Sequence, residues 1–477
     1  MLAPKFTTLA LAISAAALAL PPSALAERPA VTVRPDALVG RFSPSVTDYA
    51  VRCGDGAVEV RVGGAKGWLT AIGGGELSRS GSSATLDGDG KRAVVRMQRG
   101  AGSPVKRYSL RCLPADFPSY SFDRVRSGGA ELFSMQMIGF YAVVFSGDGA
   151  PIWWYKAEGH PDNFQVLDDG TIAYAPVDVA SDQFSKGGYL IRDIAGRKIR
   201  TVAAAGGLPT DIHELELLPN GNYVIGAQTQ HPGADTTPFG GAPDTTVAGI
   251  QIQELTRKGR LVRGWDSFGN IALAETGRWW DEPISHLFEP NDVVHWNSVD
   301  VRGNRMLVSF RHLDAVYAVN LKTGNTIWKL GGTETADSLR VVGDELGDYP
   351  LGGQHDARFG PDGTVTIYDN QTFLDDAQPR VVRYRIDADA GTAKLIEQVS
   401  DRNVPASVCC GSARPDADGN WLIGWGGFGY SAAYNSHGRR IYSIQTPQGF
   451  SYRTMPVPEG AVSKADLRRA MDKLAGR

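Results

Sequence analysis

The feature that most constrains this fold is a staggered repeat of short glycine turns that begins near Ser119. In one kind of turn, aspartate, asparagine or arginine directly precedes glycine, and a run rich in β-branched and aromatic residues follows. A second kind of glycine turn alternates with the first and also precedes a strand-like run. Asparagine or aspartate beside glycine is a strong β-hairpin signal. The first kind ends at Gly170, Gly221, Gly303, Gly363 and Gly419, and the second at Gly149, Gly196, Gly259, Gly324, Gly391 and Gly438.

Two hairpin turns in each repeat predict four strands per unit, which is one blade of a β-propeller. The second kind of turn occurs six times, and the first occurs five times, with Ser127-Gly128-Gly129 as a candidate for the sixth. We therefore predict an all-β chain in which residues 119–455 form a six-bladed β-propeller. An irregular β-sandwich with coincidental turns is the alternative.

The flanking segments predict two smaller parts. Residues 27–114 contain short alternating runs, such as 57–62 and 93–97, separated by glycine- and serine-rich turns. This pattern predicts a small β-sandwich domain, and its lack of a catalytic cluster indicates a structural or assembly role. Residues 456–477 predict a helical tail, of which 462–474 is amphipathic and is expected to dock on the propeller.

The first 26 residues have the organisation of an export signal. Lys5 supplies the positive end, residues 9–20 are apolar, and Ala24-Leu25-Ala26 offers the small residues that a signal peptidase reads. The apolar run is too short to span a bilayer comfortably, although a retained anchor is the alternative. We expect a cleaved signal peptide, residues 1–26, and a periplasmic or secreted protein without a membrane attachment.

Four cysteines follow this segment, an even count that suggests two disulfides in an oxidising compartment. Cys53 and Cys112 each end an alternating strand-like run, and we predict that they pair. The adjacent Cys409 and Cys410 then form either a strained vicinal bridge or two free buried thiols. The net charge of −3 is spread along the chain, so no basic stripe for a nucleic acid is present.

Three of the eight histidines occupy one equivalent position in the repeat. His213, His295 and His355 each lie eight residues before a turn glycine of the first kind. This position is the start of the innermost strand of a blade, close to the propeller axis. Equivalent positions near such an axis converge in space, so the sequence predicts a histidine cluster.

A cationic side chain accompanies this cluster. Arg311 lies on the expected return strand of the blade that carries His295, and strand alternation predicts that Arg311 and His312 face opposite ways. Neutral imidazoles serve as nucleophiles or bases and a guanidinium binds oxyanions, so the set suits transfer of an anionic group. Purely structural histidines and a three-histidine zinc or copper site are the alternatives. The arginine cation argues against the metal, and we predict none.

The same residues carry a resemblance to the bacterial arylsulfate sulfotransferase family, from about Ser119 to Arg453. Three of its signatures are similar in order and relative spacing to segments of this chain. These segments are His213 with 217–222, His295-x-Asn297-Ser298 with Ser309-x-Arg311-His312, and Gln354-His355-Asp356 leading to Asp362-Gly363 and Tyr368-Asp369-Asn370.

The resemblance implies a PAPS-independent, ping-pong aryl sulfotransferase that needs no cofactor. His355 matches the family histidine that a phenolic sulfate donor sulfates, and a phenolic acceptor then takes the group. His213, His295, Asn297 and Arg311 match residues that bind the sulfuryl oxygens or assist proton movement, with His295 or His213 as the base. A homodimer is a possible assembly.

Two further residues complete the predicted substrate site. Ser412 follows Gly411, which lies eight residues before a turn glycine, and segment 409–414 resembles a related branch of the family. Trp280 lies with Trp279 in a long insertion, where an aromatic ring either stacks on a phenol at the channel mouth or packs in the core.

Two other functions stay open on the sequence. The run 318–328 resembles a tryptophan-docking repeat of quinoprotein dehydrogenases, and the adjacent cysteines fit such enzymes. A quinone- or metal-dependent propeller oxidoreductase is therefore the first alternative. A non-catalytic, ligand-binding propeller is the second.

Overall fold

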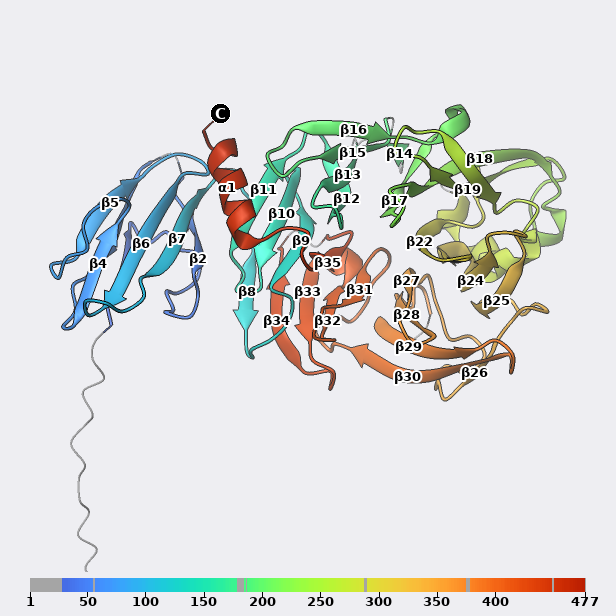
Figure 1. Ribbon diagram of the computed structural model, residues 1–477. Coiled ribbons are helices and arrows are strands. Elements are labelled where there is room, and N and C mark those ends of the chain that lie inside the picture. The colour runs from blue at the N-terminus through green and yellow to red at the C-terminus, as the bar shows by residue number, and fades with distance from the viewer. Residues whose placement is uncertain are drawn as a thin grey trace, which may run out of the picture.

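The computed structural model describes residues 28–54, 56–177, 184–185, 187–286, 290–374, 378–447 and 450–476. The predicted signal peptide, residues 1–26, lies outside them. Most regular elements of the described chain are strands, which confirms the predicted all-β class. Figure 1 shows a small N-terminal unit beside a ring of sheets, with helix α1 (Lys464–Leu474) between the two. Within the described segments, no helix has the length and apolar character that a membrane crossing requires.

Seven short strands make up the N-terminal unit, in two sheets. The first sheet contains β1 (Val31–Arg34), β3 (Val58–Val62) and β5 (Ser82–Leu86). The second has the order β2 (Asp48–Arg52), β7 (Lys106–Leu113), β6 (Arg92–Arg99) and β4 (Trp68–Ile72), with β2 and β7 parallel. Alternating apolar residues of both sheets share one buried cluster, which is the period-2 burial that the sequence pattern predicts.

A disulfide links the ends of two parallel strands in this unit. Cys53 and Cys112 are bonded, as predicted, with their Cα atoms 5.5 Å apart. Cys409 and Cys410 are free thiols, so the vicinal bridge predicted as one option is not formed. Cα atoms joined by a trans peptide lie about 3.8 Å apart, which is closer than the roughly 4.4–6.8 Å that a disulfide favours.

Loss of the Cys53–Cys112 disulfide should destabilise the N-terminal unit. The cysteines are 59 residues apart in the sequence, and closing a loop of that order contributes about 4 kcal/mol to the free energy of unfolding. We expect a variant with serine at both positions to unfold at a lower guanidinium concentration than the wild type, as followed by circular dichroism. Coincident unfolding curves would contradict this expectation.

Six further sheets follow along the described chain. The first contains β9 (Leu132–Met137), β10 (Tyr141–Ser146), β11 (Pro151–Lys156) and the last strand, β35 (Thr454–Pro456). The second contains β12 (His160–Val166), β13 (Ile172–Val177), β15 (Tyr189–Arg192) and β16 (Lys198–Val202). The third contains β14 (Phe184–Ser185), β17 (Thr210–Leu217), β18 (Tyr223–Ala234), β19 (Thr245–Leu255) and β20 (Leu261–Asp266), and β21 (Asn291–Asp292) pairs with β19.

The remaining three sheets complete the ring. The fourth contains β22 (Trp296–Arg302), β23 (Arg305–Phe310), β24 (Ala315–Asn320) and β25 (Thr326–Gly331). The fifth contains β27 (His355–Phe359), β28 (Thr364–Asp369), β29 (Arg380–Asp387), β30 (Thr392–Ser400) and β26 (Arg340–Val342). The sixth contains β31 (Ser412–Pro415), β32 (Trp421–Gly424), β33 (Tyr430–Tyr434), β34 (Arg440–Gln445) and β8 (Ser121–Arg124).

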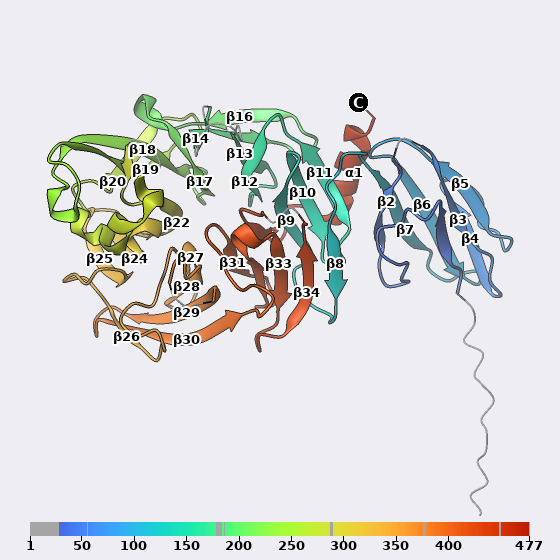
Figure 2. The same ribbon diagram turned by 180° about the vertical axis from the view of Figure 1, so that it is seen from behind.

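One strand of each sheet faces a common centre, as both views show (Figures 1 and 2). Around this centre the sheets touch in turn: β9 contacts β12, β12 contacts β17, β17 contacts β22, β22 contacts β27, β27 contacts β31, and β31 contacts β35. Strand β35 then forms hydrogen bonds with β9. Strand β8 also pairs with β34. The beginning and the end of the part of the chain that forms the ring are therefore joined by two strand pairs.

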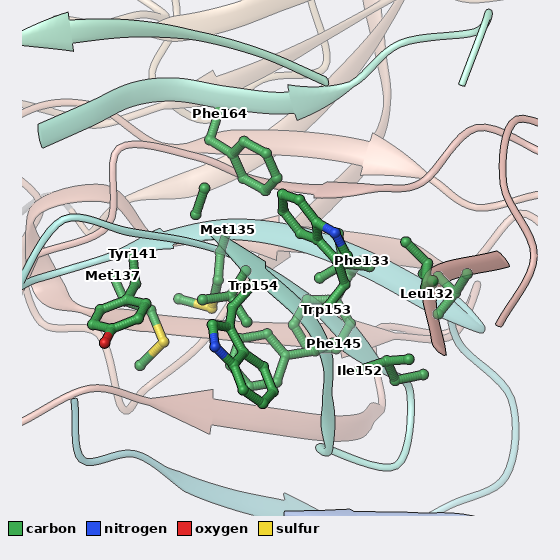
Figure 3. Close-up of a cluster of buried hydrophobic side chains, with 14 of the residues drawn as sticks. Leu132, Phe133, Met135, Met137, Tyr141, Phe145, Ile152, Trp153, Trp154 and Phe164 are labelled. Carbon is green, nitrogen blue, oxygen red and sulfur yellow. The ribbon is translucent and has the colours of Figure 1, made fainter. Parts of the chain in front are cut away.

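The largest buried cluster lies in the first sheet and against its neighbours (Figure 3). Phe133 and Phe145 stack with ring centroids 5.3 Å apart, and Trp153 stacks on Phe164 of the next sheet at 6.0 Å. Full burial of one such side chain contributes roughly 1.5–3 kcal/mol. The first contact lies within one sheet, and the second joins two neighbouring sheets.

Helix α1 packs between the ring of sheets and the N-terminal unit. Ser463 caps its first turn, and the apolar face of the helix joins the cluster of the first sheet. Arg468 pairs with Asp48 at 2.5 Å, and Asp472 pairs with Arg111 at 2.7 Å. We expected the tail to dock on the propeller; it contacts the N-terminal unit as well.

Candidate functional site

The three repeat-related histidines lie at the starts of inner strands of neighbouring sheets. His213 is in β17, His295 directly precedes β22, and His355 opens β27. The rings of His213 and His295 meet edge to face, with centroids 5.1 Å apart. His355 lies on the next inner strand, since β17 contacts β22 and β22 contacts β27. The structure therefore brings the predicted trio together.

Hydrogen bonds fix the tautomer of His355. Its Nδ1 lies 2.8 Å from Oδ1 of Asn370 and 3.0 Å from the carbonyl oxygen of Gly353, so Nδ1 carries the proton and donates. Its Nε2 accepts a hydrogen bond from the backbone N–H of Cys410 at 3.1 Å. Burial and the charge of Arg311 hold the pKa of His355 well below 6.5. His355 is thus neutral and has its lone pair on Nε2, which is the nucleophilic form of the ring.

His213 and His295 instead pair with carboxylates. Nδ1 of His213 lies 2.8 Å from Oδ1 of Asp211, and Nδ1 of His295 lies 2.5 Å from Oδ2 of Asp292. Burial lowers the pKa of His213, but the Asp211 carboxylate outweighs it, and the net pKa lies above 6.5. For His295 burial prevails over Asp292, so its pKa is lowered. Two neighbouring groups whose pKa values are pushed apart suit an acid and a base.

Arg311 and His312 lie together, so the expectation that they face opposite ways is wrong. Strand β23 ends at Phe310 and residues 311–313 form a 3-10 helix, where strand alternation no longer applies. Nη1 of Arg311 donates to Nε2 of His312 at 2.6 Å, and Nη2 donates to the carbonyl of Val408 at 3.0 Å. Nε of Arg311 is buried and donates to none of the described residues. This N–H is a donor that an oxyanion can accept from.

Trp279 provides the aromatic surface beside these groups. The Arg311 guanidinium lies 4.6 Å from the centre of its ring, and His312 stacks on it at 4.5 Å. Trp280 turns away and stacks on Phe239 at 4.8 Å within a neighbouring hydrophobic cluster. Substrate binding by Trp280 stays a prediction, and Trp279 is the better placed of the two.

Asn297 and Ser412 are fully buried and bind backbone groups. Nδ2 of Asn297 donates to the carbonyl of Gln354, the residue before His355, at 2.7 Å. The Ser412 hydroxyl donates to the carbonyl of Thr454 at 2.8 Å and accepts from its N–H at 3.0 Å, which joins β31 to β35. These contacts position inner strands, and a substrate contact by either residue stays a prediction.

Several non-glycine residues around the site adopt left-handed backbone conformations. Among them are His295 (φ 43°), Asp356 (φ 51°) and Cys410 (φ 65°). Such conformations cost on the order of 1–3 kcal/mol, and they persist where the surroundings hold them, often at functional sites. At Cys410 this backbone geometry aims the N–H at Nε2 of His355.

A buried ion cluster anchors the strands that carry the histidines. Asp356, next to His355, pairs with Arg358 at 2.7 Å, and Arg358 also contacts Glu214 on the strand of the first histidine. Arg453 pairs with Glu214 at 2.9 Å. Buried charges tolerate little displacement, because an ion left without its partner is strongly destabilising. The cluster therefore fixes β17 and β27 relative to each other.

Among the described residues, Asp292, His295 and His312 form a group with the spacing of metal ligands, because their candidate ligand atoms lie within 4.8 Å of one another. This set differs from the three-histidine site considered from the sequence. Nδ1 of His312 donates to the carbonyl of Asp292 at 2.6 Å, and its Nε2 accepts from Arg311. His312 therefore has no free lone pair, and a cation lies against it. These residues fit a hydrogen-bonded unit and not a metal site.

Sequence reasoning missed Asp292, Asn370 and the backbone N–H of Cys410 as parts of this site. Asn370 closes the Tyr-Asp-Asn motif quoted above, so a signal for it was present. An aspartate shortly before two of the histidines was also visible, and histidine pairs with such carboxylates readily. No side-chain pattern reveals a backbone N–H.

The fold and the site define a ring of β-sheets with a cluster of buried histidines and an arginine near its centre, and a sequence comparison names the family. A model of the arylsulfotransferase (ASST) family matches residues 136–452, which is more than half of the chain. The chain belongs to the arylsulfotransferase (ASST) family. Membership supports aryl sulfotransferase activity in general and implies small aryl sulfates and phenols as substrates.

Other comparisons are more distant. No significant match to a curated protein was found. Similar solved structures include a protein of unknown function from Bacteroides caccae, with 12% identity over 69% of this chain and 100% of that chain and a TM-score of 0.44. BamB from Moraxella catarrhalis has 13% identity, coverages of 77% and 86%, and a TM-score of 0.29. Virginiamycin B lyase from Staphylococcus aureus has 9% identity, coverages of 69% and 89%, and a TM-score of 0.35.

Proposed function

We propose that this chain is an exported, PAPS-independent aryl sulfotransferase that works by a ping-pong mechanism. A six-bladed propeller, residues 119–455, carries the site, and a β-sandwich, residues 27–114, precedes it. His355 accepts the sulfuryl group of a phenolic sulfate ester and passes it to a phenolic acceptor without a cofactor or metal. The observation that carries this proposal is the hydrogen bonding of the buried His355, whose Nδ1 donates to Asn370 and whose Nε2 accepts from the N–H of Cys410.

In the first half-reaction, Nε2 of His355 attacks the sulfur of the donor. The N–S bond forms as the S–O bond to the phenol breaks. The guanidinium of Arg311 stabilises the negative charge on the sulfuryl oxygens. His213, whose pKa is raised, gives its proton to the departing phenolate. The N–H of Cys410 is released from Nε2 and donates to a sulfuryl oxygen.

In the second half-reaction, the oxygen of the acceptor phenol attacks the same sulfur. The N–S bond breaks and its electron pair returns to Nε2 of His355. His295, which Asp292 orients and whose pKa is lowered, takes the proton of the phenol. The proton then passes from His295 to His213, whose ring centroid lies 5.1 Å away, and this restores the acid for the next cycle.

A kinetic assay on the metal-free protein tests this function. With p-nitrophenyl sulfate as donor and phenol as acceptor, we expect sustained nitrophenolate release and parallel double-reciprocal lines, which indicate a ping-pong mechanism. Release that requires an added metal or quinone would contradict the proposal and favour an oxidoreductase. Binding of aryl sulfates without any release would favour the non-catalytic alternative.

Asp292→Asn should shift the pH dependence of this reaction. The carboxylate raises the pKa of His295 against the effect of burial, so its removal lets that pKa fall further below 6.5. The base then stays neutral to lower pH, and the acidic limb of the kcat profile should move to lower pH. A weaker and less well oriented base should also reduce kcat by about 10- to 100-fold.

The matched control for this variant is Asp235→Asn, because Asp235 is an exposed carboxylate that accepts hydrogen bonds from Thr237 and lies outside the site. It should leave the profile as in the wild type. An acidic limb that does not move in Asp292→Asn would show that His295 is not the base.

A further inference from the structure

The outer face of the second N-terminal sheet carries two pairs of arginines in register. On the neighbouring antiparallel strands β6 and β7, Arg92 is opposite Arg111, and Arg96 is opposite Arg107. The alternate residues of β6 are buried in the core, so the arginines project from the other face. Each pair places two positive charges side by side, which is destabilising unless an anion lies between them.

The first pair has such an anion from within the chain. Oδ1 of Asp472, on helix α1, accepts from Nε of Arg92 at 3.1 Å and from Arg111 at 2.7 Å. One carboxylate thus bridges the two guanidinium groups. This is the fork geometry in which arginine binds oxyanions most strongly.

The second pair has no counterpart of Asp472 among the described residues. Arg96 donates to the carbonyl of Gly75, and its buried Nε has no acceptor in the described part of the chain. Arg107 is exposed and forms no ion pair with a described residue. The two arginines therefore occupy opposite positions on one face of the sheet, and neither has a carboxylate partner among the described residues.

A cavity of about 430 Å³ lies over this second pair. Its lining includes Arg92, Arg96, Arg107, Arg468 and Ser109. Of these arginines, Arg92 and Arg468 already pair with carboxylates. Arg96 and Arg107 are not neutralised in this way and give the cavity a net positive charge. Its volume is in the range of small-molecule sites.

We propose that this arginine pocket, formed by Arg92, Arg96, Arg107, Arg468 and Ser109, binds a small ligand that carries a sulfate or phosphate group. The oxyanion lies between Arg96 and Arg107, as the Asp472 carboxylate lies between Arg92 and Arg111. The Ser109 hydroxyl, which belongs to the same face of β7, offers one more donor. The pocket, which the N-terminal unit and Arg468 of helix α1 form, is an anion site separate from the one at His355.

Isothermal titration of the full chain with inorganic sulfate, inorganic phosphate and tripolyphosphate tests this site. The titrations use the Arg311→Ala background, in which we expect weaker anion binding beside His355. We expect at least one of these anions to bind, and more weakly as ionic strength rises. The double variant Arg96→Gln/Arg107→Gln should lose about 10-fold or more in affinity.

Two further variants sharpen the result. Arg439→Gln, which changes an exposed arginine in a turn of the ring, should bind as the background does. Arg107→Lys keeps the charge but not the fork, and its affinity should lie between those of the background and the double variant. Circular dichroism establishes that each variant is folded.

The relative affinities identify the source of the ligand. Tighter binding of sulfate points to a sulfate ester, and tighter binding of phosphate points to a phosphate ester. Unchanged affinity in the folded double variant, or no binding of any of the three anions, would overturn the proposal. Binding of heparin or DNA alone would do the same, because it would reflect general attraction to a basic surface. No turnover is needed, so these outcomes are independent of the sulfotransfer reaction.

Discussion

His355→Ala should lower kcat/KM for p-nitrophenyl sulfate by about 10⁴-fold or more, because it removes the only atom to which the sulfuryl group is bonded between the two half-reactions. His213 and His295 do not replace it, since each has its Nδ1 bound to a carboxylate and serves as acid or base. Steady-state release of nitrophenolate measures the effect.

The matched control is His437→Ala, since His437 is an exposed histidine in a turn of the sixth sheet. This variant should have the kinetic constants of the wild type. If His355→Ala retained turnover within about 10-fold of the wild type, direct transfer from donor to acceptor would be the better description. Melting curves of both variants establish that they fold.

Arg311→Lys should reduce kcat by about 10²- to 10³-fold with a smaller change in KM, because the charge on the sulfuryl oxygens grows toward the transition state. Lysine keeps the positive charge but loses the planar fork. It also loses the two directed contacts with His312 and Val408 that hold the guanidinium in place. The rate of the initial nitrophenolate burst reports on the same step.

Arg278→Lys is the matched control, because Arg278 also lies over the ring of Trp279, at 4.4 Å, but pairs with the buried Asp314 at 2.7 Å. We expect this variant to lose stability and to keep its kcat. Equal losses of kcat in the two variants would show that the site needs only a well-packed Trp279.

The repeat allowed the histidine cluster to be predicted, because equivalent positions in a repeat have equivalent places in space. His213, His295 and His355 share no local motif, and their common spacing from a turn glycine relates them. Their division of roles was not predictable, because it depends on which acceptor each Nδ1 meets. That acceptor is a carboxylate for two of them and an amide oxygen for His355.

One incorrect expectation, and two features that the sequence left undecided, have local physical causes. We expected His312 and Arg311 to face opposite ways because we assumed that the strand continued through them. Strand β23 ends at Phe310, one residue before Arg311, and nothing in the sequence marks that end. Trp279 and Trp280 are adjacent, and only the 3-10 turn that carries them decides which ring reaches Arg311. The arginine pocket was overlooked because the register of β6 and β7 becomes visible only once the strands are paired.

The most direct test of the sulfohistidine mechanism is to locate the sulfuryl group after the first half-reaction. The protein is mixed with excess p-nitrophenyl sulfate without an acceptor, quenched at alkaline pH, digested and mapped by mass spectrometry. The mechanism predicts one sulfuryl group per chain on the peptide that contains His355, and its loss when phenol is added before the quench. A sulfuryl group on another side chain, such as Cys409, or full turnover without any modified peptide, would contradict it.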